Sequence, residues 1–153
     1  GKKGILGVNI GPNKETKDQK NDFCLGLKNF FDIADYITVN ISSPNTEGLR
    51  DFHDQEKLID LMVALNKIKK ENKTNIPLLL KVSPDIRVDD ISEITGIAMK
   101  NNIAAIIEIH PNANIILTIV LYLSFSKSLS DILPKSCGKS VPVKLTLEAQ
   151  KSD

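Results

Sequence analysis

Four short apolar runs recur along the chain, and each ends at loop-forming residues. They are rich in aliphatic and β-branched side chains, and the first leads directly into Gly11 and Pro12. Short apolar runs bounded by turn residues are typical of strands buried on both faces. We therefore expect strands at Gly4–Ile10, Tyr36–Ile41, Pro77–Val82 and Ile103–Ile109.

The stretches between these runs carry apolar residues at every third or fourth position, which is the period of an amphipathic helix. Asp18 precedes the first stretch, and aspartate is a favoured N-cap residue. We expect helices over Asp18–Phe31, over about Asp54–Lys70, and around Ile91, Ile94, Ile97 and Ala98 with Asp89 or Asp90 as the cap.

Alternation of strands and helices predicts the α/β class, with a parallel sheet and right-handed crossovers. A complete eightfold barrel takes about 250 residues, whereas an open doubly wound sheet fits in about 150. The length of 153 residues by itself therefore favours the open sheet. Sequence motifs are needed to decide between the two.

Polar side chains gather where the predicted strands end. They are Asn9 and Asn13 around the first strand, Asn40, Ser42, Ser43, Asn45 and Thr46 after the second, and Lys81 and Asp85 around the third. Ligands of α/β proteins bind at the carboxyl ends of parallel strands, so these residues are candidates for one site. The glycine-rich dinucleotide and phosphate motifs and the helical zinc motif are all absent from the sequence. A site of those kinds is not predicted.

Three segments together resemble the dihydroorotate dehydrogenases. They are GVNIGPNK at the first strand, NISSPNTEGLR from Asn40 to Arg50, and LLLKVSPD around Lys81. The resemblance implies an FMN-dependent (β/α)8 TIM barrel that oxidises dihydroorotate to orotate in pyrimidine biosynthesis. It outweighs the argument from length, and residues 1–107 would form the central part of an incomplete barrel of about four or five β/α units.

The resemblance makes Ser43 the catalytic base that removes the C5 proton of dihydroorotate while a hydride passes from C6 to flavin N5. Class 1 enzymes carry cysteine at this position, so serine implies the membrane-linked class 2, in which quinone is the second oxidant. A serine hydroxyl is a weak base at neutral pH, and we expect a relay through Thr46 or a water.

Other motif positions imply contacts with substrate and cofactor. Asparagine offers both donor and acceptor atoms, which suits the carboxylate and amide edges of orotate. A lysine beside the flavin N1 and O2 edge would stabilise negative charge there. The resemblance assigns substrate contacts to Asn40, Ser43, Asn45 and Thr46, and FMN contacts to Asn9, Asn40, Lys81 and Gly138.

Ordinary structural roles compete with each assignment. Asparagine and serine after a strand are often turn formers, and Lys81 could extend its amine along an apolar surface to solvent. His53 and His110 have no companion ligands in the sequence and read as surface or loop residues, so no metal site is predicted.

Similarity to the family lapses after residue 107. The expected substrate and flavin motif is replaced by IIEIHPNANIIL, residues 108–137 stay unassigned, and residues 138–153 loosely resemble a later barrel segment. Compensating frameshifts, a retained intron or a wrong gene model would produce this pattern, and a genuine divergent insertion is the alternative.

Composition limits the partners. The net charge of +1 and the absence of tryptophan argue against nucleic acid, and two distant cysteines, Cys24 and Cys137, suggest a reducing compartment. Ile115–Phe125 is shorter than the roughly 20 residues of a membrane span. The resemblance implies the mitochondrial inner membrane, or the inner membrane of a bacterium, reached through an N-terminal segment that we expect upstream of Gly1.

Two other functions remain open at this stage. One is a non-catalytic degenerate paralogue or a mispredicted gene product, and the weaker one is another flavin barrel that acts on pyrimidines. A partial barrel exposes sheet edges and apolar surface. We therefore expect the isolated chain to be poorly soluble or partly unfolded, and not to retain FMN.

Overall fold

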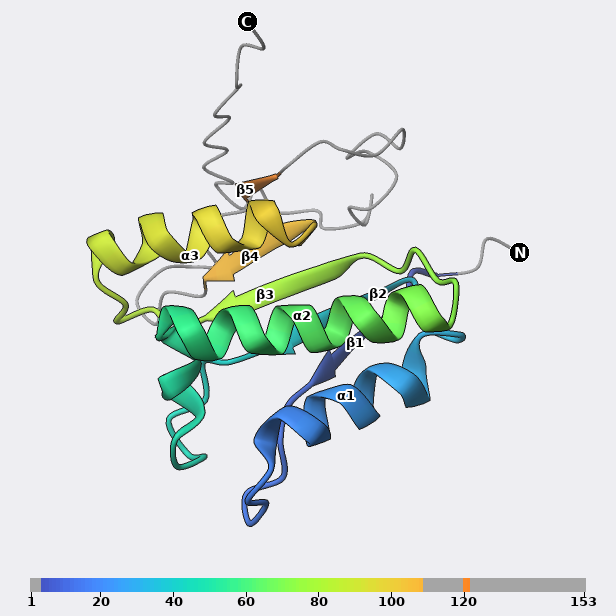
Figure 1. Ribbon diagram of the computed structural model, residues 1–153, viewed down its shortest axis with the longest axis horizontal. Helices are drawn as coiled ribbons and strands as arrows, with labels where there is room; N and C mark the ends of the chain where they lie inside the picture. Colours follow the sequence, from blue (N-terminus) through green and yellow to red (C-terminus); the bar gives the residue numbers. More distant parts are fainter. Residues whose placement is uncertain (1–3, 109–119, 122–153) are drawn as a thin grey trace, which may run out of the picture.

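The computed structural model describes residues 4–108 and 120–121 of the chain. Four strands pair in parallel and in sequence order, and a short fifth strand pairs antiparallel with the fourth (Figure 1). The elements are β1 (Gly7–Ile10), α1 (Gln19–Phe30), β2 (Tyr36–Asn40), the 3-10 helix η1 (Leu49–His53), α2 (Gln55–Glu71), β3 (Leu78–Val82), α3 (Val88–Lys100), β4 (Ala105–Glu108) and β5 (Val120–Leu121).

The three α-helices form one layer over the sheet. Helix α1 packs against α2, and α2 packs against α3, in front of the strands in Figure 1. A doubly wound sheet would carry helices on both faces, whereas sequential parallel strands under a single helix layer are the arrangement of a (β/α) barrel wall. The open sheet favoured by chain length is therefore wrong, because a chain can hold fewer units than a closed barrel.

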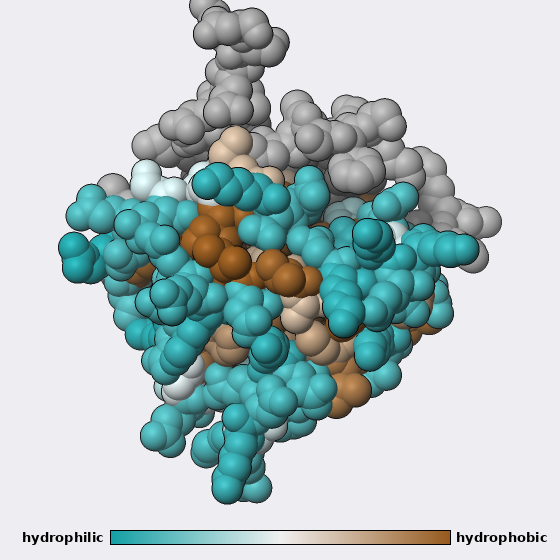
Figure 2. Space-filling view, viewed as in Figure 1, coloured by the Kyte–Doolittle hydropathy of each residue, from teal (hydrophilic) through white to brown (hydrophobic). Residues whose placement is uncertain are grey.

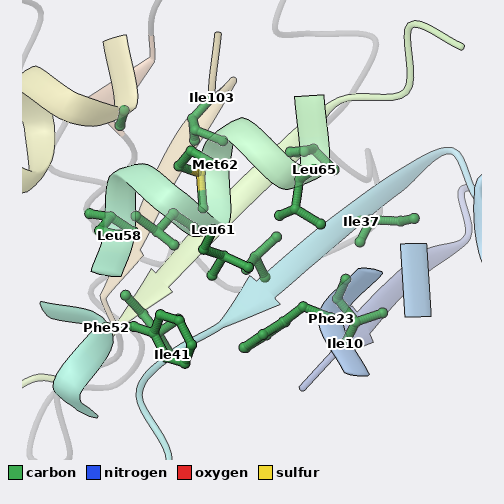
Figure 3. Close-up of a cluster of buried hydrophobic side chains, with 14 of the residues drawn as sticks. Ile10, Phe23, Ile37, Ile41, Phe52, Leu58, Leu61, Met62, Leu65 and Ile103 are labelled. Carbon is green, nitrogen blue, oxygen red and sulfur yellow. The ribbon is translucent and has the colours of Figure 1, made fainter. Parts of the chain in front are cut away.

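The hydrophobic core lies between this helix layer and one face of the sheet (Figure 3). Along β2 and β3 every second residue points into it, which follows from the two-residue period of a strand. From the helices, the rings of Phe23 and Phe52 meet edge to face with centroids 5.7 Å apart. Fully buried side chains include Ile37, Val39, Leu58, Leu61, Leu65 and Leu80.

Strand β1 is shorter than the sequence pattern predicts. It begins at Gly7, and the residues of Gly4–Leu6 are exposed, with 45% of Ile5 and 48% of Leu6 accessible. β1 is the edge of the described sheet, so no strand pairs with its outer side there. An apolar run shows that a segment tends to be buried, but it does not show where its ladder partners begin.

Helix starts were predicted with mixed success. Asp18 caps α1 as expected, since its side chain accepts from the backbone N–H of Asn21 at 3.0 Å. The prediction that Asp89 or Asp90 caps α3 is wrong, because the N-cap is Arg87 and makes no side-chain capping bond. Both aspartates lie inside the first turn, where a negative charge still complements the helix dipole.

Gly26 lets α1 approach the sheet closely. A Cβ atom built at this position would lie 3.0 Å from Ile10 Cγ2 and 3.1 Å from Ile10 Cβ. Those distances are shorter than ordinary carbon–carbon contacts. The missing side chain therefore sets the separation between α1 and β1.

Several predicted features lie outside the described residues. They include His110, Gly138, and most of Ile115–Phe125, of which Val120–Leu121 form β5. Within residues 4–108 and 120–121, none of the helices has the length and apolar character needed to cross a membrane.

Candidate functional site

The candidate site lies on the face of the sheet that the helices leave uncovered. Asn9 pairs in register with Thr38, and Asn40 pairs with Lys81. Their neighbours Ile10, Val39 and Leu80 point into the core under the helices, so the two-residue period turns the four polar side chains the other way. Three predicted contact residues from three strands thus share one face.

Asn40 and Lys81 are bridged by the hydroxyl group of Ser42. Lys81 Nζ donates to Ser42 Oγ at 2.5 Å, and Ser42 Oγ donates to Asn40 Oδ1 at 2.7 Å. The backbone N–H of Ser42 also donates to Asn40 Oδ1, at 3.1 Å. Ser42 is only 4% exposed, so this bridge is shielded from solvent.

Asn40 therefore has fewer free hydrogen-bonding atoms for a ligand than the sequence suggests. Its Oδ1 atom already accepts two hydrogen bonds from Ser42, and a carbonyl oxygen has two lone pairs. Only the Nδ2 donors remain for a ligand, contrary to the expectation that Asn40 supplies both kinds of atom.

The Lys81 amine is partly buried, and burial lowers its pKa. Among the side chains of residues 4–107, no carboxylate lies within salt-bridge distance of it. Its contact with buried Ser42 also differs from the alternative in which the side chain simply extends to solvent. An ammonium group without a carboxylate partner is suited to a ligand that carries negative charge or electron-rich oxygens.

Ser43 follows directly and is half-buried. Its Oγ accepts from the backbone N–H of Asn45 at 3.3 Å, so the two residues form a local turn. Asn45 is exposed and Thr46 is half-buried. The expected relay from Ser43 to Thr46 is not formed by any hydrogen bond between their side chains in the described part of the chain.

An exposed ion pair, here called the clasp, joins η1 to the loop after β3. Arg50 Nη1 donates to Asp85 Oδ2 at 2.8 Å, and Ser83 Oγ donates to the other carboxylate oxygen of Asp85. The Ser83 hydroxyl is the first cause, and Arg50 a further one, that lowers the pKa of Asp85. All three residues belong to the motifs that carry the family resemblance.

His53 is not the simple surface residue that the sequence suggests. It ends η1 and is half-buried, and its buried Nε2 atom has no hydrogen-bond partner in the described part of the chain. Burial is the main cause that lowers its pKa, and the positive charge of Arg50 adds to the effect.

The sequence placed Ser42 and Asp85 among the polar residues at the strand ends, but it assigned no role to Ser42 and did not predict the clasp between Arg50 and Asp85. A signal for Ser42 was present, because it lies two residues after Asn40 and strand periodicity brings such residues to the same side. The clasp joins residues that are 35 positions apart in the sequence, and no local sequence pattern predicts such a contact. Among the described residues no cluster of side chains could hold a metal ion.

Comparison with known proteins identifies relatives of this chain. The sequence model of the family described as "Dihydroorotate dehydrogenase" matches residues 2–124. A dihydroorotate dehydrogenase (quinone) of Bartonella tribocorum is 48% identical over 99 residues, which make up 60% of this chain and 28% of that protein. The mitochondrial dihydroorotate dehydrogenase (quinone) of Cyclocybe aegerita is 37% identical over 111 residues, covering 70% and 34% respectively.

The fold has the same relatives. The crystal structure of DHODH from Eimeria tenella in complex with ferulenol superposes with a TM-score of 0.62 at 28% identity, covering 67% of this chain and 32% of that one. The chain thus spans about a third of the length of these relatives.

Proposed function

Because the chain belongs to the dihydroorotate dehydrogenase family, we propose that it forms the part of such an enzyme that holds the catalytic serine loop and one side of the flavin site. The reaction is the oxidation of dihydroorotate to orotate in pyrimidine biosynthesis, with FMN as acceptor and quinone as second oxidant. The observation that carries the proposal is the gathering of Asn9, Asn40 and Lys81 on the uncovered face of the sheet, beside the loop that bears Ser43.

The residues on this face suit FMN. The Asn40 amide and the Lys81 amine are joined through Ser42 on this face and both keep hydrogen-bond donors, and among the side chains of residues 4–107 Lys81 has no carboxylate partner. The pyrimidine edge of an isoalloxazine ring presents carbonyl oxygens and ring nitrogen, which accept from such donors. Asn9, Asn40 and Lys81 would hold this edge, and Gly138 is proposed as a further contact.

Dihydroorotate must lose two hydrogens for its C5–C6 bond to become a double bond. Ser43 would take the proton from C5, and bound FMN would supply the acceptor for the hydride that leaves C6. Since the Asn45 N–H already donates to Ser43 Oγ, the hydroxyl proton stays free to pass to water as Oγ receives the substrate proton. Asn40, Asn45 and Thr46 would orient the substrate, which converts the reaction into an intramolecular one.

The quinone and the membrane enter the proposal through the relatives. One of them is named as mitochondrial and others are bacterial, so the proposed location is the mitochondrial inner membrane or the bacterial inner membrane. Contact with the membrane would be made by a segment outside this chain.

A chimera tests the proposed function. Residues 4–108 would replace the matching segment of the Bartonella tribocorum enzyme, and orotate formation would be measured with and without Ser43→Ala. We expect the chimera to be active and Ser43→Ala to lower kcat by about 10²–10⁴, the usual contribution of a positioned base. FMN content serves as the control for folding.

Two results would contradict the assignment. An FMN-loaded chimera without activity would indicate a degenerate, non-catalytic segment. Unchanged dihydroorotate oxidation in the Ser43→Ala chimera would remove Ser43 from the mechanism and favour a different flavin barrel chemistry.

A further inference from the structure

The hydroxyl group of Ser42 can serve its two neighbours in only one way. In its ammonium form Lys81 has donors and no acceptor, so Ser42 Oγ must accept across the 2.5 Å contact. The hydroxyl carries a single proton, and Asn40 Oδ1 at 2.7 Å is the acceptor placed to receive it. The direction of both hydrogen bonds is therefore fixed by chemistry.

The orientation of the Asn40 amide follows from the same constraint. Oxygen and nitrogen of an asparagine side chain are distinguished by their hydrogen-bond partners. Here the backbone N–H and the hydroxyl of Ser42 both donate toward one atom, at 3.1 and 2.7 Å. That atom must be Oδ1, since an NH₂ group in its place would face two donors.

We propose that Ser42 is a positioning residue that sets the polarity of the site, by holding Asn40 and Lys81 so that both offer only hydrogen-bond donors to the ligand. The amide keeps two N–H donors on Nδ2, and the ammonium keeps two more on Nζ. Because Ser42 is 4% exposed, water does not readily take over the role of its hydroxyl group. The ligand edge that binds here must therefore consist of acceptors, such as carbonyl oxygens, unprotonated ring nitrogen or a carboxylate.

This inference rests on the proposed function only in naming FMN as the ligand, so its test begins without ligand. The isolated 153-residue chain would be studied by NMR as wild type, Ser42→Ala, Ser42→Thr and Ser43→Ala. The two readouts are the pKa of Lys81, from its side-chain carbon and nitrogen shifts, and the side-chain amide signals of Asn40. Circular dichroism would verify that each variant is folded.

Removing the hydroxyl group takes away an acceptor from the ammonium and a donor from the amide. Ser42→Ala is expected to lower the pKa of Lys81 further, because the ammonium form loses a hydrogen-bond acceptor, and to shift the Asn40 amide signals. Ser42→Thr retains a hydroxyl group, so the Lys81 pKa and the Asn40 amide signals should stay close to those of the wild type. Ser43→Ala is the matched control, because the Ser43 hydroxyl contacts only the Asn45 backbone N–H among the described residues.

FMN would then be bound to the chimera with the Bartonella tribocorum enzyme, where its acceptor edge is expected to move the Asn40 Nδ2 and Lys81 signals. Absence of those shifts in the FMN-loaded chimera would contradict the proposed function and leave the Ser42 result standing. The positioning role itself is overturned if Ser42→Ala leaves both the Lys81 pKa and the Asn40 signals as they are in the wild type.

Discussion

Single side chains at the strand ends determine which hydrogen-bond donors and acceptors the candidate site offers to a ligand. Sequence motifs were sufficient to select Asn9, Asn40 and Lys81, and the structure places all three on one face of the sheet. They could not show that Asn40 Oδ1 is already occupied, because this depends on the rotamers of Ser42 and Lys81 across two strands. The shared face of these residues was predictable from sequence, and the direction of their hydrogen bonds was not.

His53 gives the chain a stability that depends on pH. Its pKa is lowered in the folded state, mainly by burial, so the unfolded chain binds more protons between the folded pKa and about 6.5, the ordinary value. Stability is then present above this ordinary value and is lost as the pH falls toward the folded pKa.

We expect His53→Gln to remove the loss of stability that occurs as the pH falls. Urea unfolding between about pH 5 and 7, the range in which histidine titrates, should show a flatter dependence of the unfolding free energy on pH than the wild type. Asp85 does not interfere, since its pKa is lowered from an ordinary value of 3.8. Parallel pH profiles of the two proteins would show that His53 is not the group responsible.

At the scale of elements, the periodic signals worked best. Helices α1 and α2 lie within a residue or two of the predicted ranges, because each buries a continuous apolar stripe and the spacing of that stripe is written in the sequence. Limits of β1 and the cap of α3 were missed. The start of β1 depends on where its pairing with β2 begins, at the edge of the described sheet. Helix α3 begins after Arg87, which makes no side-chain capping bond, so the preference for an aspartate cap did not determine its start.

Two helical glycines should respond in opposite ways to alanine. A methyl group at Gly26 would press on Ile10 at about 3 Å, whereas nothing lies within 4 Å of one at Gly96 in α3. Overpacking costs about 1–3 kcal/mol, and glycine to alanine in a helix gains roughly 0.5–1 kcal/mol.

Gly26→Ala is therefore expected to lower the unfolding free energy by about 1 kcal/mol net, and Gly96→Ala to raise it by up to about 1 kcal/mol. Denaturant unfolding of the two variants checks the signs. Stabilisation by Gly26→Ala would mean that α1 can move away from β1 without loss, and that the close approach is not important.

At the scale of the whole molecule, the distribution of exposed apolar surface determines how readily the chains associate. The helix-bearing face is largely polar with a limited apolar patch (Figure 2), and Ile59 and Val63 on α2 are 42% and 56% exposed. Beside the unpaired edge of β1, Ile5 and Leu6 are also exposed. An apolar sheet edge of this kind promotes association between chains.

Ile5→Lys is expected to reduce that association. A charge next to an edge strand opposes edge-to-edge pairing, and Ile5 is not one of the residues that form the core or pack against it. Light scattering of the purified chain should fall, with the unfolding free energy changed by less than about 0.5 kcal/mol, as is usual for surface substitutions. Equal scattering from both proteins would place the source of association elsewhere.

The central claim is that this chain carries one part of a flavin site and depends on the remaining barrel units to use it. It is tested most directly by the flavin absorbance that co-elutes in gel filtration after FMN is added, for the isolated chain and for the chimera with the Bartonella tribocorum enzyme, followed by dihydroorotate under anaerobic conditions. We expect the isolated chain to elute without flavin, and the chimera to elute with FMN that dihydroorotate bleaches. A chimera whose bound FMN is not bleached by dihydroorotate would contradict the account.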